Sequence, residues 1–121
     1  MREPDGRRAL GLAVAGIAGI EARVAPLVPV YHAVAQEPAG AVFQRSKDLR
    51  RDGMNGFGEA LAAKTPLRRG MTRQRAADLL FVLTGPETYR AFVLDVGWTH
   101  EAWVEWVTDV LTRELFSDTL D

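Results

Sequence analysis

The chain has 121 residues, of which 47% are hydrophobic and 26% charged, a composition typical of one globular domain rather than of a disordered chain. It has no cysteine, which excludes disulfides and thiolate metal sites, and its two histidines argue against a multi-histidine zinc site. The 15 basic residues nearly balance the 16 acidic residues, so no net basic field points to nucleic acid or to an anionic membrane.

The first predicted helix covers residues 5–25, where apolar side chains recur at three- to four-residue spacing. Its uncharged run from Ala9 to Ile20 resembles the apolar part of a signal peptide. However, Glu3 and Asp5 precede the run, and the apolar positions continue beyond it in phase. The run is also too short to span a bilayer as a helix. We therefore expect a buried helix in a cytoplasmic protein with no membrane partner.

Pro26 and Pro29 interrupt this helix, because proline lacks a backbone donor and clashes with the preceding turn. A short helix is predicted to follow as far as Gln36, and a long third helix covers residues 41–63. The third helix contains a glycine-rich stretch at residues 53–58, which weakens the expectation of a continuous rod. The stretch lacks the preceding strand and the lysine of a nucleotide-binding loop, so helix packing is the preferred interpretation.

The last third of the sequence predicts a fourth helix that begins after Thr72, a good N-cap residue, and breaks at Gly85 and Pro86. A further apolar segment ends at Gly97, and Thr99 caps the last helix. No alternation typical of strands occurs. The chain is therefore predicted to be one all-α domain of five or six helices over residues 1–121.

No catalytic motif is present, so we do not expect an enzyme, a cofactor or a metal. Glu101 and Glu105 share a helix face, but such pairs are usually exposed surface, and His32 and His100 have no evident metal partner; we expect His100 to be exposed. The arginines at 68, 69, 73 and 75 are interpreted as a solvated loop. The default binding site is an apolar cavity. Its predicted lining residues are Val14, Ile17, Tyr31, Met54 and Phe57.

The final helices also carry more apolar surface than a monomer of this size easily covers. If Phe81, Trp103 and Trp106 are left exposed they form an apolar patch, and such patches generally mark partner surfaces, so a partner at this surface is expected.

The order of several segments resembles the C-terminal regulatory domain of TetR-family transcriptional regulators. The segments are residues 21–30 (Glu-Ala-Arg-Val-Ala-Pro-Leu-Val-Pro-Val), 51–54 (Arg-Asp-Gly-Met), 67–72 (Leu-Arg-Arg-Gly-Met-Thr), 76–90 (Ala-Ala-Asp-Leu-Leu-Phe-Val-Leu-Thr-Gly-Pro-Glu-Thr-Tyr-Arg), 97–99 (Gly-Trp-Thr) and 103–107 (Trp-Val-Glu-Trp-Val).

This resemblance implies a repressor domain that dimerises through its last two long helices, packed as an intermolecular four-helix bundle. A small hydrophobic ligand would bind among residues 10–36 and 43–61, and the homodimer face would fall within residues 76–83 and 103–115. The interface residues that the resemblance implies are Ala77, Leu80, Phe81, Trp103, Trp106 and Val110. The family's N-terminal helix-turn-helix domain has no counterpart in this chain, so DNA would be bound only through such a domain elsewhere. The alternative is a standalone helical dimerisation or interaction module with no ligand.

Overall fold

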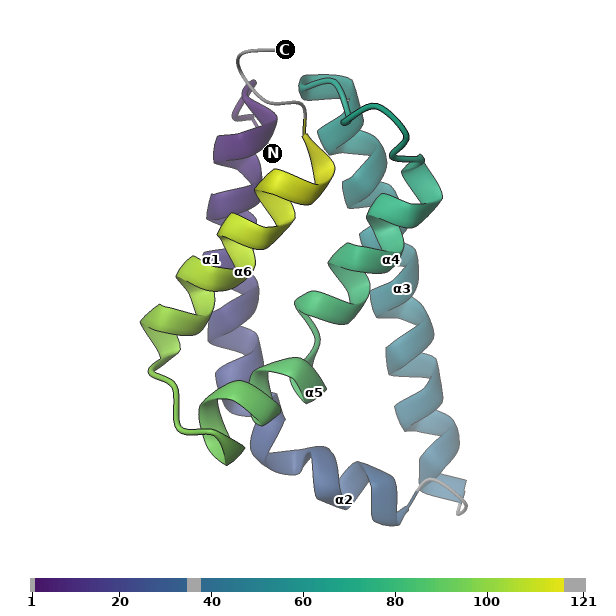
Figure 1. Ribbon diagram of the computed structural model, residues 1–121. Coiled ribbons are helices and arrows are strands. Elements are labelled where there is room, and N and C mark those ends of the chain that lie inside the picture. The colour runs from purple at the N-terminus through teal and green to yellow at the C-terminus, as the bar shows by residue number, and fades with distance from the viewer. Residues whose placement is uncertain (1, 35–37, 117–121) are drawn as a thin grey trace.

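The computed structural model describes residues 2–34 and 38–116, and the regular secondary structure of these residues is helical apart from one isolated antiparallel bridge between Leu67 and Phe116. The chain runs along the molecule, crosses one end, returns, and repeats this course in its second half (Figure 1). The elements are α1 (Gly6–Val24), a 3-10 turn (Ala25–Leu27), α2 (Val28–Ala33), α3 (Pro38–Lys64), α4 (Arg73–Leu83), α5 (Pro86–Tyr89), a π-helical turn (Arg90–Asp95) and α6 (His100–Leu115).

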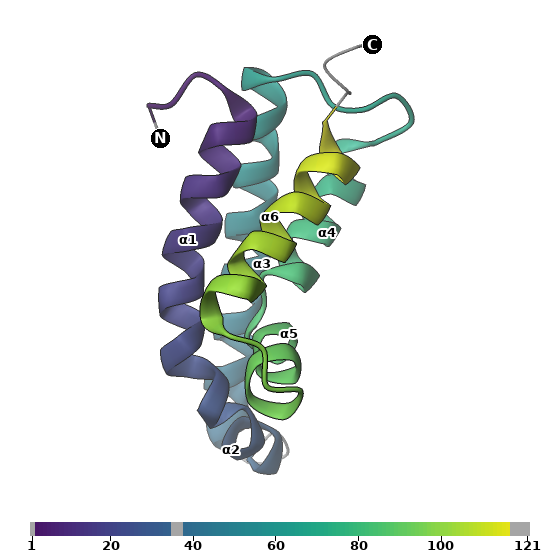
Figure 2. The ribbon, with the colours of Figure 1, turned by 60° about the vertical axis from the view of Figure 1, so that its left-hand side comes forward.

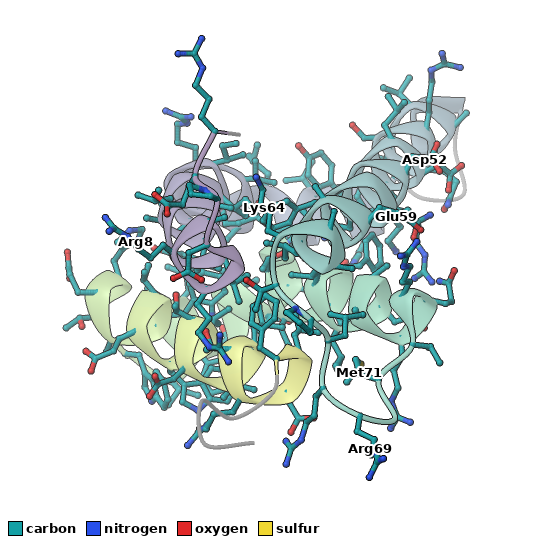
Figure 3. The ribbon with its side chains drawn as sticks, turned by 90° about the horizontal axis from the view of Figure 1, so that it is seen from above. Arg8, Asp52, Glu59, Lys64, Arg69 and Met71 are labelled. Carbon is teal, nitrogen blue, oxygen red and sulfur yellow. The ribbon has the colours of Figure 1, made fainter. Side chains whose placement is uncertain are left out.

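The long helices pack as two layers, because α6 lies against α1 and α4 lies against α3. Figure 2 shows α6 crossing α1 at an angle, with α3 behind them. The short elements α2 and α5 lie together at the end of the bundle remote from the start of α1 (Figure 1). Seen along the bundle, Arg8 and Glu59 lie on the outside of their helices, and Arg69 points away from the α3–α4 loop into solvent (Figure 3).

Local signals in the sequence account for most helix boundaries. The side chains of Thr72 and Thr99 accept hydrogen bonds from the backbone amides of Arg75 and Ala102, which confirms both predicted N-caps. Pro86 begins α5 directly after the predicted break. Gly97 has a φ of +94°, a conformation that favours glycine and explains why the π-helical segment ends there.

Two elements differ from the prediction. Helix α3 is continuous from Pro38 to Lys64, although glycines at 53, 56 and 58 predicted a weaker rod. Gly58 faces Ala77, where a Cβ would lie 3.8 Å from the Ala77 backbone, an ordinary van der Waals distance, so the packing of α3 on α4 does not require glycine at this position. The predicted short helix is a 3-10 turn followed by α2, and its predicted end at Gln36 lies outside the described residues.

The core forms where α1, α4 and α6 meet. Trp103 is fully buried there, and the Tyr89 ring contacts it edge-on with 4.9 Å between ring centroids. A second aromatic group consists of Phe92, Trp98 and Trp106. The ring centroids of Phe92 and Trp98 lie 4.7 Å apart, and those of Trp98 and Trp106 lie 5.9 Å apart. Aromatic side chains bury large areas, so these contacts fix the π-helical turn against α6.

The outer face of α1 remains apolar. Leu12 is 59% exposed and Ile20 is 51% exposed. By length and composition, the helical stretch Gly6–Ala33 is apolar enough to cross a membrane, with 28% of its most apolar window buried in the chain. Core helices of soluble proteins and N-terminal signal sequences share these properties.

Two glycines in α1 should respond in opposite ways to alanine. A Cβ at Gly6 would lie 2.8 Å from both Cβ and Oγ1 of Thr65, whereas a Cβ at Gly16 meets nothing within 4 Å. Gly6→Ala is expected to lower the free energy of unfolding by about 1–3 kcal/mol through overpacking. Gly16→Ala is expected to raise it by up to about 1 kcal/mol through helix propensity. Urea denaturation of both variants checks this; a Gly6→Ala protein as stable as the parent would contradict it.

Candidate ligand-binding site

A cavity of about 610 Å³ lies where the end of α1, α2, the first half of α3 and the start of α5 meet. These elements gather at the end of the bundle that α2 crosses (Figure 1). Most of the lining is apolar, and the charged members come from three different helices. The lining residues are Ile20, Glu21, Val24, Val30, Tyr31, Val34, Val42, Phe43, Ser46, Lys47, Arg50, Pro86 and Glu87.

The cavity exists because proline turns the chain beneath it. Pro26 lies in the 3-10 turn and Pro29 in the first turn of α2, so α2 leaves the axis of α1 and closes one end of the space. Tyr31 of α2 then stacks on Phe43 of α3, with ring centroids 4.8 Å apart and planes inclined by 17°. This aromatic pair holds α2 against α3.

Glu21 is the most unusual group in the lining. It is only 3% exposed, and its Oε2 has no hydrogen-bond partner among the described residues. Burial raises the pKa of Glu21 to about 7, and the carboxylate of Glu87 adds to this effect, while the positive charge of Arg50 opposes it. Near neutral pH this carboxyl is therefore divided between its neutral and ionised forms.

Arg50 lies at the polar end of the cavity and is fixed there by contacts with Phe81. Its Nη1 donates a hydrogen bond to the Phe81 carbonyl at 2.7 Å, and its guanidinium lies 3.8 Å from the centroid of the Phe81 ring. Burial lowers the pKa of Arg50, and the carboxylates of Glu21 and Glu87 partly offset that effect. A Cβ at Gly85 would lie 3.2 Å from Nη2 of Arg50, so the glycine at this break leaves room for the guanidinium.

The rim carries weaker ionic contacts. Nε2 of His32 lies 3.8 Å from Oε1 of Glu87, and both side chains are about half exposed. Exposed pairs of this kind contribute little to stability. Arg90 also donates a hydrogen bond to the Ala25 carbonyl at 3.4 Å and so links the π-helical turn to the 3-10 turn that follows α1.

Of the five predicted ligand-binding residues, Tyr31 lines this cavity and the other four do not. Val14 is buried in the core, and Met54 and Phe57 are half-buried against it. Ile17 is half-buried on α1, ahead of the lining residue Ile20. The predicted cavity was thus placed nearer the middle of the bundle than the one observed.

Sequence reasoning missed Glu21 and Arg50, because charged residues in helices are usually exposed. One signal for Glu21 was present. The positions Val14, Ala18, Glu21 and Ala25 follow the spacing of one helix face, and all four are buried. An acidic residue in phase with a core stripe indicates a buried carboxylate.

The prediction that His100 is exposed was wrong. Its side chain is half-buried, and a hydrogen bond of 2.8 Å joins its Nδ1 to the Tyr89 hydroxyl. Glu101 and Glu105 are exposed as expected. Residues 68, 69, 73 and 75 are exposed as well, and Arg73 pairs with Glu59 at 2.9 Å. In the described part of the chain, no three His, Asp or Glu side chains gather as a metal site would require.

The predicted dimer residues fall into two groups. Ala77, Leu80 and Trp103 are buried within their own chain, so a partner could not reach them without rearrangement. Phe81, Trp106 and Val110 are half-buried. Phe81 is additionally covered by Arg50 and by Arg51, which pairs with Asp78.

In comparisons with known proteins, no family model, no curated protein and no solved structure matches this chain.

Proposed function

We propose that this chain is a ligand-sensing domain that resembles the regulatory domain of TetR-family repressors, is not an enzyme, binds a small hydrophobic molecule and acts as a cytoplasmic homodimer. The observation that carries the proposal is the cavity of about 610 Å³, with mostly apolar walls and a few charged groups at one end. Small-molecule sites commonly have this size and this mixture of walls. DNA would be bound only through a helix-turn-helix domain outside this chain.

A binding experiment tests the ligand half of this proposal. The neutral fluorophore N-phenyl-1-naphthylamine brightens in apolar surroundings and is small enough for the cavity. We expect the intact protein to bind it, and we expect Val24→Trp, which fills the cavity, to weaken binding at least tenfold. Leu12→Trp is the matched control, because Leu12 is exposed on the same helix and does not line the cavity. Equal binding by the two variants would contradict the cavity as the binding site.

The dimer half of the proposal rests on an exposed apolar side chain of α4 and on two partly exposed ones of α6. Val82 of α4 is 57% exposed, and Trp106 and Val110 of α6 are half-buried. Helix α4 has 11 residues and α6 has 16, so α4 is short for one of two long dimer helices. Light scattering at micromolar concentration is expected to give a dimer, which Val82→Glu with Val110→Glu should dissociate. A monomeric parent protein would contradict the four-helix-bundle assignment.

A second candidate is a standalone helical interaction module without a ligand. Exposed apolar side chains outside the cavity, Leu12 of α1 and Leu49 of α3, favour it, because exposed apolar surface generally marks a partner site. Under this alternative, the fluorophore does not bind, Val24→Trp only alters stability, and native mass spectrometry finds no bound small molecule.

A further inference from the structure

We infer that the ligand of this cavity is a lipophilic amine, whose protonated nitrogen meets the carboxylate of Glu21 and whose hydrocarbon body lies against the apolar walls. The inference rests on the proposed function, since it names the chemical class of the ligand that the cavity would take.

The first observation is the unsatisfied oxygen. Glu21 lines the cavity, is 97% buried, and its Oε2 receives no hydrogen bond from the described residues. A buried carboxylate oxygen without a donor is unfavourable, because it has lost its water and gained nothing in return. A ligand N–H group brought to the Glu21 carboxylate from the cavity would supply a charge-assisted hydrogen bond, the stronger kind.

The second observation is that the basic groups of the cavity lining already have contacts within the chain. Arg50 donates to the Phe81 carbonyl and stacks on the Phe81 ring, and Lys47 lies 5.6 Å from the centroid of the Phe43 ring. Glu87 approaches from α5 and adds a second negative charge, with His32 of α2 beside it. An anionic ligand would compete for occupied cations, whereas a cation would meet the carboxylate that has no donor.

The walls suit the rest of such a molecule. Val24, Val30, Val34 and Val42 present aliphatic surface, and the stacked rings of Tyr31 and Phe43 present an aromatic face. Aromatic faces attract cations as well as apolar groups. A single amine at one end of a hydrocarbon chain matches this division between polar and apolar lining.

Ionisation of Glu21 gives the inference a signature in pH. Because its pKa is about 7, an amine that binds the ionised form must release a proton from the neutral form. For a group with this pKa, affinity for the amine should rise about tenfold between pH 6 and pH 8 and then level off. A carboxylate ligand should show the opposite trend, because ionised Glu21 repels it.

The test compares three ligands of equal length on the full chain: decylamine, decanol and decanoate, each displacing N-phenyl-1-naphthylamine. We expect decylamine to bind at least tenfold more tightly than decanol at pH 8, with the rise between pH 6 and pH 8 given above. Glu21→Gln should weaken decylamine at least tenfold at pH 8 and abolish that rise. Circular dichroism establishes that the variant is folded.

Two control variants separate Glu21 from other charged groups. Glu105→Gln should leave decylamine affinity unchanged, because Glu105 is exposed on α6 and does not line the cavity. His32→Gln should leave the pH dependence in place. If decanol or decanoate binds as tightly as decylamine and Glu21→Gln changes nothing, the amine inference is overturned while the ligand-binding proposal stands. If neither the three ligands nor the fluorophore binds, both the amine inference and the proposed function are overturned.

Discussion

Replacing Trp103 by alanine is expected to lower the free energy of unfolding by about 3–5 kcal/mol, the range for deletion of a large buried aromatic side chain. Trp103 is fully buried, and its ring contacts Tyr89 at 4.9 Å between centroids. The surrounding helices cannot collapse fully into the space left behind, so a cavity adds to the lost burial. Urea denaturation at fixed protein concentration measures the change, with the concentration fixed because dimerisation would contribute to stability.

Trp103→Phe is the informative control. The Nε1 of Trp103 has no hydrogen-bond partner in the described structure, and phenylalanine removes that unsatisfied donor while keeping a ring against Tyr89. We therefore expect Trp103→Phe to cost less than half as much as Trp103→Ala. A Trp103→Ala protein within 1 kcal/mol of the parent would show that this residue is not at the centre of the core.

Glu21→Gln is expected to stabilise the protein at pH 8 by about 1–3 kcal/mol and to have little effect at pH 4. The pKa of Glu21 is raised from 4.5 to about 7 in the folded state, mainly by burial. Between these values the folded protein binds more protons at this site than the unfolded chain, so stability falls as pH rises from 4.5 to 7. Below 4.5 both states are protonated and the site contributes nothing, and above 7 the full destabilisation is present.

Thermal unfolding of parent and variant from pH 4 to pH 8 measures this difference. Glu105→Gln is the matched control, because Glu105 is exposed on α6 and its replacement should give a pH-independent difference within about 0.5 kcal/mol. A Glu21→Gln protein that is less stable than the parent at pH 8 would show that the ionised carboxylate has a favourable partner.

The sequence predicted those parts of the fold that depend on local chemistry. Thr72, Thr99, Pro86 and Gly97 mark helix boundaries through their own hydrogen bonds or backbone angles, and each lies where it was expected. Such signals need no knowledge of the rest of the chain. The all-α class followed from the same local patterns.

The candidate site depends on contacts that the local pattern does not contain. Glu21 and Arg50 are 29 positions apart in the sequence, and only the packing of α1 on α3 brings their charges close enough to affect each other's pKa. The hydrogen bond of His100 could not be predicted for the same reason, because its partner Tyr89 belongs to the segment before Gly97. A residue's pattern within its own helix cannot reveal which side chain another helix will place beside it.

The aromatic residues show a related limit. Their abundance predicted uncovered apolar surface, but Trp103 is buried by its own chain. The π-helical turn Arg90–Asp95, which periodicity did not predict, brings Phe92 to Trp106 at 4.9 Å between ring centroids. Part of the expected dimer surface is thus satisfied within one molecule.

The hydrogen bond from Arg50 to the Phe81 carbonyl links the cavity to the end of α4. Helix α4 has no basic residue in its own last turn, and Arg50 of α3 supplies a positive charge there, where the helix dipole is negative. One guanidinium therefore serves both as cavity wall and as the C-terminal stabiliser of α4. A ligand that draws Arg50 away from the Phe81 carbonyl would destabilise the end of α4. By thermodynamic reciprocity, a partner that stabilises α4 would change the affinity of the cavity for that ligand by the same factor.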